Sequence, residues 1–118
     1  MSIAPTRTLH HAGMSIQVFA DAGAASRAAA LMIRDVIRDA VSVRDRAVIG
    51  LATGATPQKV YAQLVAMHGA KNLSFRNVIT YNLDEYYPIQ PLDPKSYRSY
   101  MHQHLFGLVD LPANQTHV

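Results

Sequence analysis

A loop of four small residues between an apolar run and a proline carries the clearest chemical signal in the sequence. The loop is Thr53, Gly54, Ala55 and Thr56, and Pro57, which suits the first turn of a helix, follows it. This order predicts a strand, a tight loop and a helix, with the Thr56 hydroxyl as helix cap. The unpaired N–H groups of a first helical turn carry about half a positive charge, and Gly54 lets a ligand approach the backbone. The loop therefore suits an anion, and phosphate is the first candidate.

The loop matches neither of the two common nucleotide-binding motifs. No lysine follows its glycine as in a P-loop, and Gly50 and Gly54 lack the third glycine of a dinucleotide fingerprint. On the motif alone, a turn that only caps its helix remains the alternative.

Two adjacent acids, Asp84 and Glu85, end a second apolar run rich in β-branched and aromatic residues at 77–83. Successive strand residues point to opposite faces, so both acids cannot face the same substrate atom. One is a candidate general base that removes a proton from a carbon next to a carbonyl, as in aldose–ketose isomerisation. The other is expected to pair with a basic group or to cap a neighbouring turn. A solvated acid at a strand end is the alternative reading of either residue.

Alternating strands and helices must position these residues. The pattern predicts strands at 15–20, 47–52, 77–83 and 115–118, and helices at 23–42, 57–68 and from Asp93–Pro94 to Gly107. This order predicts a parallel α/β sheet with helices on its faces. Because parallel strands bring their carboxyl ends to one edge, the Thr53–Thr56 loop and the acidic pair should converge on one cleft.

Two further expectations concern the first third of the chain. Residues 1–13 show no periodicity and are expected to form a loosely held tail. The helix at 23–42, capped by Asp21, is expected to pack through one apolar stripe and to expose its arginines on the opposite side. The stripe comprises Ala25, Ala28, Ala29, Met32, Val36 and Ala40, and the arginines are Arg27, Arg34 and Arg38.

The composition argues against disulfides, thiolate metal sites, nucleic-acid binding and membrane insertion. The 118 residues are 49% hydrophobic and contain no cysteine, which excludes disulfides and thiolate metal sites. The net charge of +3 comes from scattered basic residues and favours a small anionic metabolite over nucleic acid. We find neither an apolar run of about 18 residues nor a signal-peptide pattern, and expect a cytoplasmic protein without membrane contact. His102 and His104 fall on different helix faces, so no metal site is expected.

Two segments resemble the glucosamine-6-phosphate deaminase (isomerase) family. They are 51–65 and 74–106, and the second includes the N-x-D-E-Y pattern at the end of its strand. The resemblance implies a Rossmann-like parallel sheet with helices on both faces, a three-layer αβα fold incomplete in this chain. It also implies conversion of D-glucosamine 6-phosphate and water to D-fructose 6-phosphate and ammonia, without a cofactor. Asp84 matches the family's proton acceptor between C2 and C1, and Thr53–Thr56 match its phosphate loop; Glu85 and Tyr86 are candidates for supporting the cleft.

The sequence departs from the family pattern in two ways. Ala55 stands where the family usually has Gly or Ser, and a positive φ would be less comfortable there. The family's ring-opening Asp, His and Glu lie in an N-D-G-H-I-type segment, which does not occur before Val118. Residues 14–118 are therefore expected to be the N-terminal half of one domain, inactive alone. A homo-oligomer is left open for the full-length enzyme.

Two other function classes remain open. The first is 6-phosphogluconolactonase, a sugar-phosphate hydrolase of similar architecture whose strand typically ends in D-E-R, whereas Tyr86 follows the acids here. The second is a non-catalytic sugar-phosphate sensor, which would keep the phosphate loop and need no base.

Overall fold

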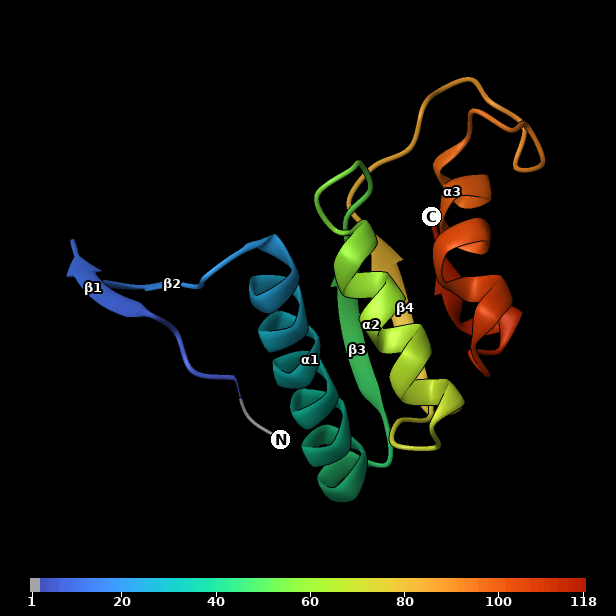
Figure 1. Cartoon of the computed structure of the whole chain (residues 1–118). Helices are drawn as coiled ribbons and strands as arrows, with labels where there is room; N and C mark the ends of the chain where they lie inside the picture. Colours follow the sequence, from blue (N-terminus) through green and yellow to red (C-terminus); the bar gives the residue numbers. More distant parts are fainter. Residues whose placement is uncertain (1–2) are drawn as a thin grey trace.

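The main body is a three-stranded parallel sheet with three helices packed on one side of it (Figure 1). This computed structural model describes residues 3–118. The elements are β1 (Arg7–His11), β2 (Met14–Val18), α1 (Ala22–Arg44), β3 (Ala47–Leu51), α2 (Gln58–Gly69), β4 (Val78–Asn82), α3 (Tyr97–His104), the 3₁₀ turns η1 (Phe106–Leu108) and η2 (Ala113–Gln115), and β5 (Thr116–His117). In this part of the chain, no helix is long and apolar enough to cross a membrane.

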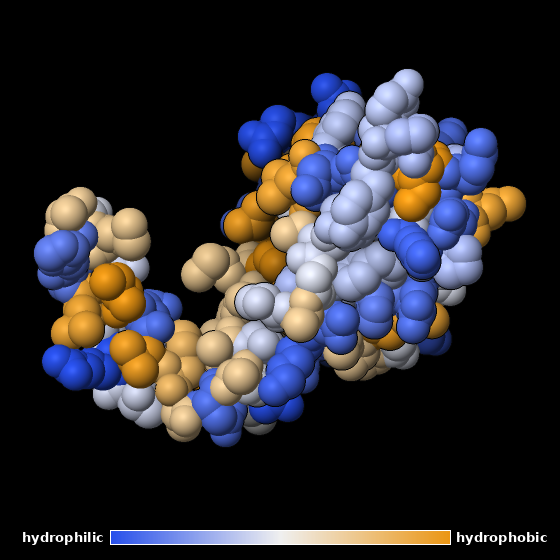
Figure 2. Space-filling model, turned by 90° about the horizontal axis from the view of Figure 1, so that it is seen from above, coloured by the Kyte–Doolittle hydropathy of each residue, from blue (hydrophilic) through white to orange (hydrophobic). Residues whose placement is uncertain are grey.

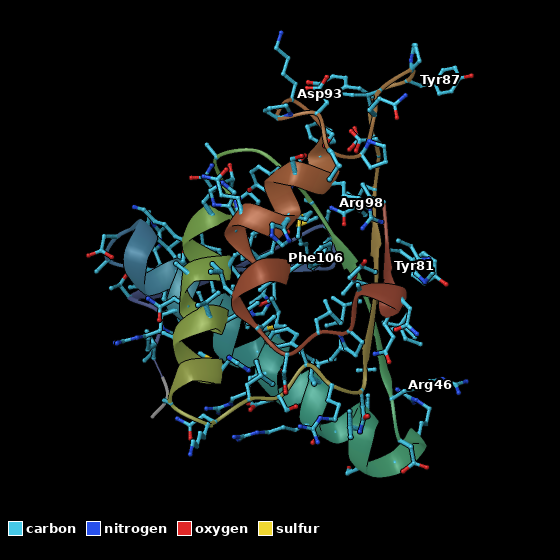
Figure 3. The ribbon with its side chains drawn as sticks, turned by 90° about the vertical axis from the view of Figure 1, so that its right-hand side faces the viewer. Arg46, Tyr81, Tyr87, Asp93, Arg98 and Phe106 are labelled. Carbon is cyan, nitrogen blue, oxygen red and sulfur yellow. The ribbon has the colours of Figure 1, made fainter. Side chains whose placement is uncertain are left out.

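The sheet confirms the expected parallel, Rossmann-like arrangement. Its strand order is β3-β4-β5, and both neighbouring pairs are parallel. Each step from strand through helix to the next strand moves in the same direction across the sheet. Because such crossovers are right-handed in nearly all proteins, both connecting helices fall on the same face. The second helical layer expected on the other face is therefore not formed within residues 3–118 (Figure 3).

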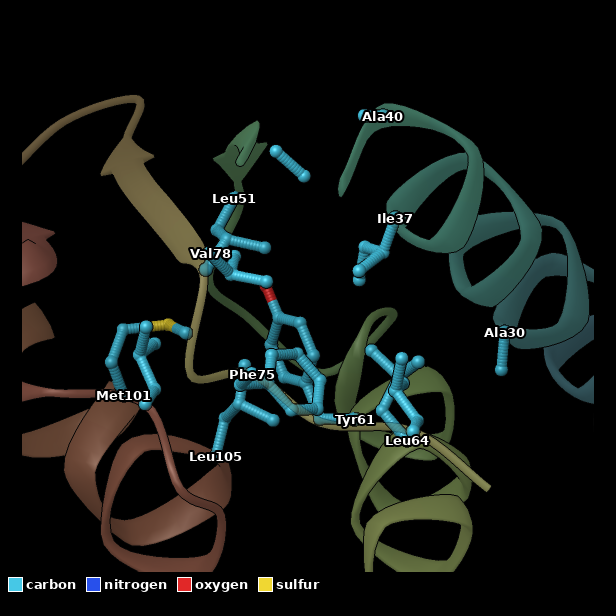
Figure 4. Packing of buried hydrophobic residues seen from close by; sticks show 13 residues of the cluster. Ala30, Ile37, Ala40, Leu51, Tyr61, Leu64, Phe75, Val78, Met101 and Leu105 are labelled. Atoms are coloured by element: carbon cyan, nitrogen blue, oxygen red, sulfur yellow. The ribbon is translucent and has the colours of Figure 1, made fainter. Parts of the chain in front are cut away.

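One hydrophobic core joins the helices to this sheet face (Figure 4). Along β3 and β4, alternate side chains point into it, which is the period of two that strands impose. All three helices contribute fully buried residues to the same cluster. Its principal members are Ala30, Ile37, Leu51, Tyr61, Leu64, Phe75, Val78, Met101 and Leu105.

Helix α1 is longer than expected and turns a different face inward. Asp21 caps it as predicted, its carboxylate accepting from the Ala24 N–H at 2.8 Å. The buried residues are Ala30, Ile37 and Ala40, whereas the other stripe residues predicted to pack stay exposed or half-buried. The most exposed of them are Met32 and Val36. The prediction was wrong because α1 has two apolar sides, and only the one facing α2 and β3 is covered.

Of the three α1 arginines expected to be solvated, Arg27 and Arg38 are exposed, and Arg34 is partly buried. The Arg38 guanidinium donates to the Asn72 carbonyl beyond α2. Arg34 is half-buried and pairs with Asp35 at 3.0 Å. Two of the three arginines therefore make specific contacts in addition to facing water.

The N-terminal segment forms a β-hairpin where a loose tail had been expected. Strands β1 and β2 pair antiparallel, and Ala12 and Gly13 between them both adopt positive φ, as a tight two-residue hairpin turn requires. This hairpin stands apart from the sheet, so β2 is not the edge strand predicted there. Figure 2 shows the gap beside it, a cleft of about 930 Å³ between the hairpin and α1. Met1 and Ser2 of the expected tail lie outside the described residues.

The remaining helix boundaries shift by a few residues from those expected. Helix α2 ends with Gly69 inside it, and the positive φ falls on Lys71 instead. Helix α3 starts at Tyr97 because Asp93 to Ser96 form a separate turn, in which the Ser96 N–H donates to the Asp93 carbonyl at 2.9 Å. Gly107 lies in the 3₁₀ turn after α3. The strand expected near the C-terminal end is present as β5.

Candidate functional site

The loop after β3 presents a row of unpaired backbone donors. Within residues 3–118, the N–H groups of Thr53, Gly54, Ala55 and Thr56 donate to no acceptor. Gly54 has a φ of 103°, a conformation that side-chain-bearing residues rarely adopt. Consecutive free amides at the start of a helix are a typical anion-binding arrangement.

The expected Thr56 cap is not made. Pro57 occupies the cap position of α2 with helical φ and ψ of −80° and −5°, and no side chain caps the helix. A main-chain bond closes this end instead, from the Gln58 N–H to the Ala55 carbonyl at 3.3 Å. The Thr56 hydroxyl is therefore left free to serve a ligand.

The strain anticipated at Ala55 does not arise. Positive φ falls on Gly54, whereas Ala55 is not among the non-glycine residues with positive φ. The alanine therefore keeps its amide available at no conformational cost.

Asp84 lies beside this loop at the same edge of the sheet. Leu51 and Asn82 are paired in register, so Thr53 and Asp84 each follow their strand by two residues. Adjacent strands are about 4.8 Å apart, which keeps the two connections close where they leave the sheet. The Leu83 N–H ties them together by donating to the Leu51 carbonyl at 3.1 Å. Asp84 is exposed and makes no hydrogen bond within the described chain.

Glu85 does what the second acid was expected to do: it caps a neighbouring helix. Its carboxylate accepts from the N–H groups of Tyr97 and Arg98, the first residues of α3, at 2.8 and 3.1 Å. It also accepts from the Tyr86 N–H at 2.9 Å. Desolvation opposes ionisation of this carboxyl, but the three N–H groups and the Arg98 charge together lower the pKa of Glu85. Glu85 thus remains a carboxylate that joins β4 to α3.

Three tyrosines surround the two connections. The Tyr86 and Tyr97 hydroxyls share a hydrogen bond of 3.2 Å, and this bond raises the pKa of Tyr86. Tyr100 on α3 donates to the Gly54 carbonyl at 2.6 Å, and desolvation raises the pKa of its phenol. With raised pKa values, the phenols of Tyr86 and Tyr100 stay protonated at neutral pH.

Sequence reasoning missed Asn82, the last residue of β4. Its side-chain nitrogen and oxygen are both buried and have no partner within residues 3–118. Leaving such atoms unpaired costs free energy, so this amide is available to a ligand or a water molecule. The N-x-D-E-Y pattern contained Asn82 and could have drawn attention to it.

The histidines form no metal-binding arrangement in the described part of the chain. His104 packs on Tyr100 with ring centroids 4.5 Å apart. No group of three or more metal-ligating side chains occurs within residues 3–118.

A parallel sheet with helices packed on it defines a Rossmann-like α/β domain. Its family follows from comparison with known proteins. The chain belongs to the family described as glucosamine-6-phosphate isomerases/6-phosphogluconolactonase, whose pattern matches residues 20–118.

Similar proteins agree on this assignment. A glucosamine-6-phosphate deaminase of Geobacillus sp. (strain WCH70) is 48% identical over 71% of this chain and 34% of its own length. One from Pseudoalteromonas translucida is 41% identical over 89% of this chain and 38% of its own. The chain thus matches little more than a third of these relatives.

Two solved structures are similar as well. A monomeric glucosamine-6-phosphate deaminase is 38% identical, with a TM-score of 0.75 over 81% of this chain and 38% of its own. A protein of Neisseria gonorrhoeae described as a putative 6-phosphogluconolactonase shares the fold, at 19% identity and a TM-score of 0.63 over 76% of this chain and 37% of its own.

Proposed function

We propose that this chain supplies the phosphate-binding loop and the proton-transferring base of a glucosamine-6-phosphate deaminase. The complete reaction converts D-glucosamine 6-phosphate and water to D-fructose 6-phosphate and ammonia. The observation that carries the proposal is the row of free amides at 53–56 beside the unpaired carboxylate of Asp84. The names of the relatives agree with it.

The roles follow from the arrangement of the site. The amides of Thr53–Thr56 and the threonine hydroxyls bind the sugar phosphate, and this remote binding energy holds the reacting carbons near the base. Asp84 moves the proton between C2 and C1 of the open-chain sugar. Glu85 and Tyr86 support the cleft by fixing α3 against the end of β4. The proposal carries with it a small sugar phosphate as ligand, no cofactor and a cytoplasmic location.

The central test is Asp84→Asn in the full-length protein. We expect ammonia release from glucosamine 6-phosphate to fall by about 10²–10⁴-fold, because a general base contributes about that much. Binding of fructose 6-phosphate, measured by isothermal titration calorimetry, should persist because the loop is unchanged. The matched control is Asp45→Asn, which lies beyond the opposite end of β3 and has a left-handed φ of 63° that asparagine tolerates. It should leave turnover unchanged.

Three results would contradict the proposal. Normal turnover by Asp84→Asn would remove the base from its assigned role. Hydrolysis of a 6-phosphogluconolactone without ammonia release would assign the site to the lactonase reaction. Sugar-phosphate binding by wild-type protein with no turnover of either substrate would indicate a sensor.

A further inference from the structure

Two tyrosines from two helices bind main-chain carbonyls in and next to the Thr53–Thr56 loop. The Tyr100 hydroxyl donates to the Gly54 carbonyl at 2.6 Å, and the Tyr61 hydroxyl donates to the Ala52 carbonyl. Their rings meet edge to face, with centroids 6.5 Å apart and an angle of 71° between the planes. The loop is therefore held at both sides of Thr53 by side chains outside it.

Fixing these carbonyls also fixes the amides that share their peptide units. In a trans peptide the C=O and the N–H point in opposite directions. The only cis bond in the described chain is Tyr87–Pro88, so the units 52–53 and 54–55 are trans. Drawing the Gly54 carbonyl toward α3 therefore turns the Ala55 N–H away from α3. The Ala52 carbonyl orients the Thr53 N–H in the same way.

Tyr100 is itself held in place. Met101, which follows it on α3, and Leu105, just beyond the end of α3, are fully buried in the core. Glu85 and Ser96 cap the start of the helix, and the Ser96 hydroxyl accepts from the Ser99 N–H at 3.0 Å. Helix α3 thus contacts both connections: Tyr100 binds the loop after β3, and the start of the helix binds Glu85 after β4. Glu85 is the direct neighbour of Asp84, so α3 links the loop to the Asp84 segment.

We infer that Tyr100 is a positioning residue that directs the Ala55 N–H toward the substrate phosphate and keeps the loop in register with Asp84. This inference rests on the proposed function, because it concerns the same site. Gly54 makes the role necessary: a glycine at φ 103° is freer to move than any other residue, and the Tyr100 hydroxyl removes that freedom.

The test is Tyr100→Phe, which removes one oxygen and keeps the ring packed against the core. In the full-length protein, we expect KM for glucosamine 6-phosphate to rise about three- to tenfold, the effect of losing one hydrogen bond, with kcat within twofold. Binding of fructose 6-phosphate should weaken by the same factor. In NMR titrations of residues 1–118 with fructose 6-phosphate, the Ala55 amide of the variant should need a correspondingly higher concentration to shift.

The matched control is Tyr81→Phe on the opposite face of the sheet. Its ring stacks on His117 at 4.5 Å, and its hydroxyl makes no hydrogen bond in the described chain. This variant should bind and turn over like wild type.

The outcomes separate the inference from the function on which it rests. Failure of wild-type protein to bind sugar phosphate would remove the proposed function. Wild-type binding with an unchanged KM in Tyr100→Phe would overturn only the inference, and so would a fall in kcat at constant KM or an equal loss in Tyr81→Phe.

Discussion

The two faces of the β3-β4-β5 sheet carry similar residues but have different surroundings. The helix-covered face, formed by Ala47, Ile49, Leu51, Val78, Thr80 and Asn82, lies under α2 and its neighbours. The open face, formed by Val48, Ile79, Tyr81, Leu83 and His117, has no helix over it within residues 3–118 (Figure 3). Val78 is 0% exposed, whereas Val48 is 62% exposed. Residue type alone therefore does not decide burial; the direction of the crossovers does.

A matched pair of leucine substitutions tests whether the two faces of the sheet differ in burial, and it has the largest expected effect. Leu51 on the covered face is 7% exposed, and Leu83 on the open face is 76% exposed. We expect Leu51→Ala to lower the free energy of unfolding by about 2–5 kcal/mol, because it leaves a cavity. Leu83→Ala should change it by less than about 0.5 kcal/mol. Urea denaturation of both variants measures the difference, and equal losses would show that the open face is buried in solution.

The next largest effect is expected for Glu85, which lies just after β4 and caps α3. Glu85→Ala removes the acceptor of two α3 amides, and we expect a loss of about 1–2 kcal/mol. Hydrogen exchange of the Tyr97 and Arg98 amides measures whether the loss comes from fraying at the start of α3. Lys95→Ala is the control at an exposed position just before the helix, and protection of those amides should be unchanged in it.

The smallest effect is expected for Asp110, which binds the segment just before β4. Asp110 accepts from the Ser74 hydroxyl and the Phe75 N–H, both at 2.6 Å, and lies 3.3 Å from His68. Desolvation opposes ionisation, but these donors and His68 lower the pKa of Asp110 from 3.8. A lowered pKa contributes stability that is present above the unfolded value and lost as pH falls through the folded value.

Asp110→Asn should therefore cost about 1 kcal/mol at neutral pH and little below the folded pKa. Denaturation at several pH values between neutral and about 2 measures the difference from wild type. A difference that stayed constant over this range would show that the Asp110 charge contributes nothing.

Local patterns predicted much of the fold. The glycine-containing loop before Pro57 and the β-branched run before Asp84 placed β3, β4 and the edge that they share. The resemblance pointed to the same two features. The alternation of strand side chains predicted that one of the two acids would pair with a basic group or cap a turn, and the acid that does so is Glu85.

Long-range features could not be predicted from such patterns. The inward face of α1 depends on which neighbour covers it, and both of its sides are apolar. The hairpin depends on two residues with positive φ, Ala12 and Gly13, of which only one is a glycine. The Tyr100 bond to Gly54 joins residues 46 positions apart, and no local spacing indicates it.

The strand order β3-β4-β5 also bears on where a crevice can open at the carboxyl edge of the sheet. Strands β4 and β5 lie on the same side of β3, which leaves the other edge of β3 unpaired in the described chain. A strand added at that edge would be reached by a connection running the opposite way across the sheet, and crevices open where connections diverge in this manner. The proposed phosphate loop at Thr53–Thr56 would then line the mouth of that crevice, next to the free edge of β3.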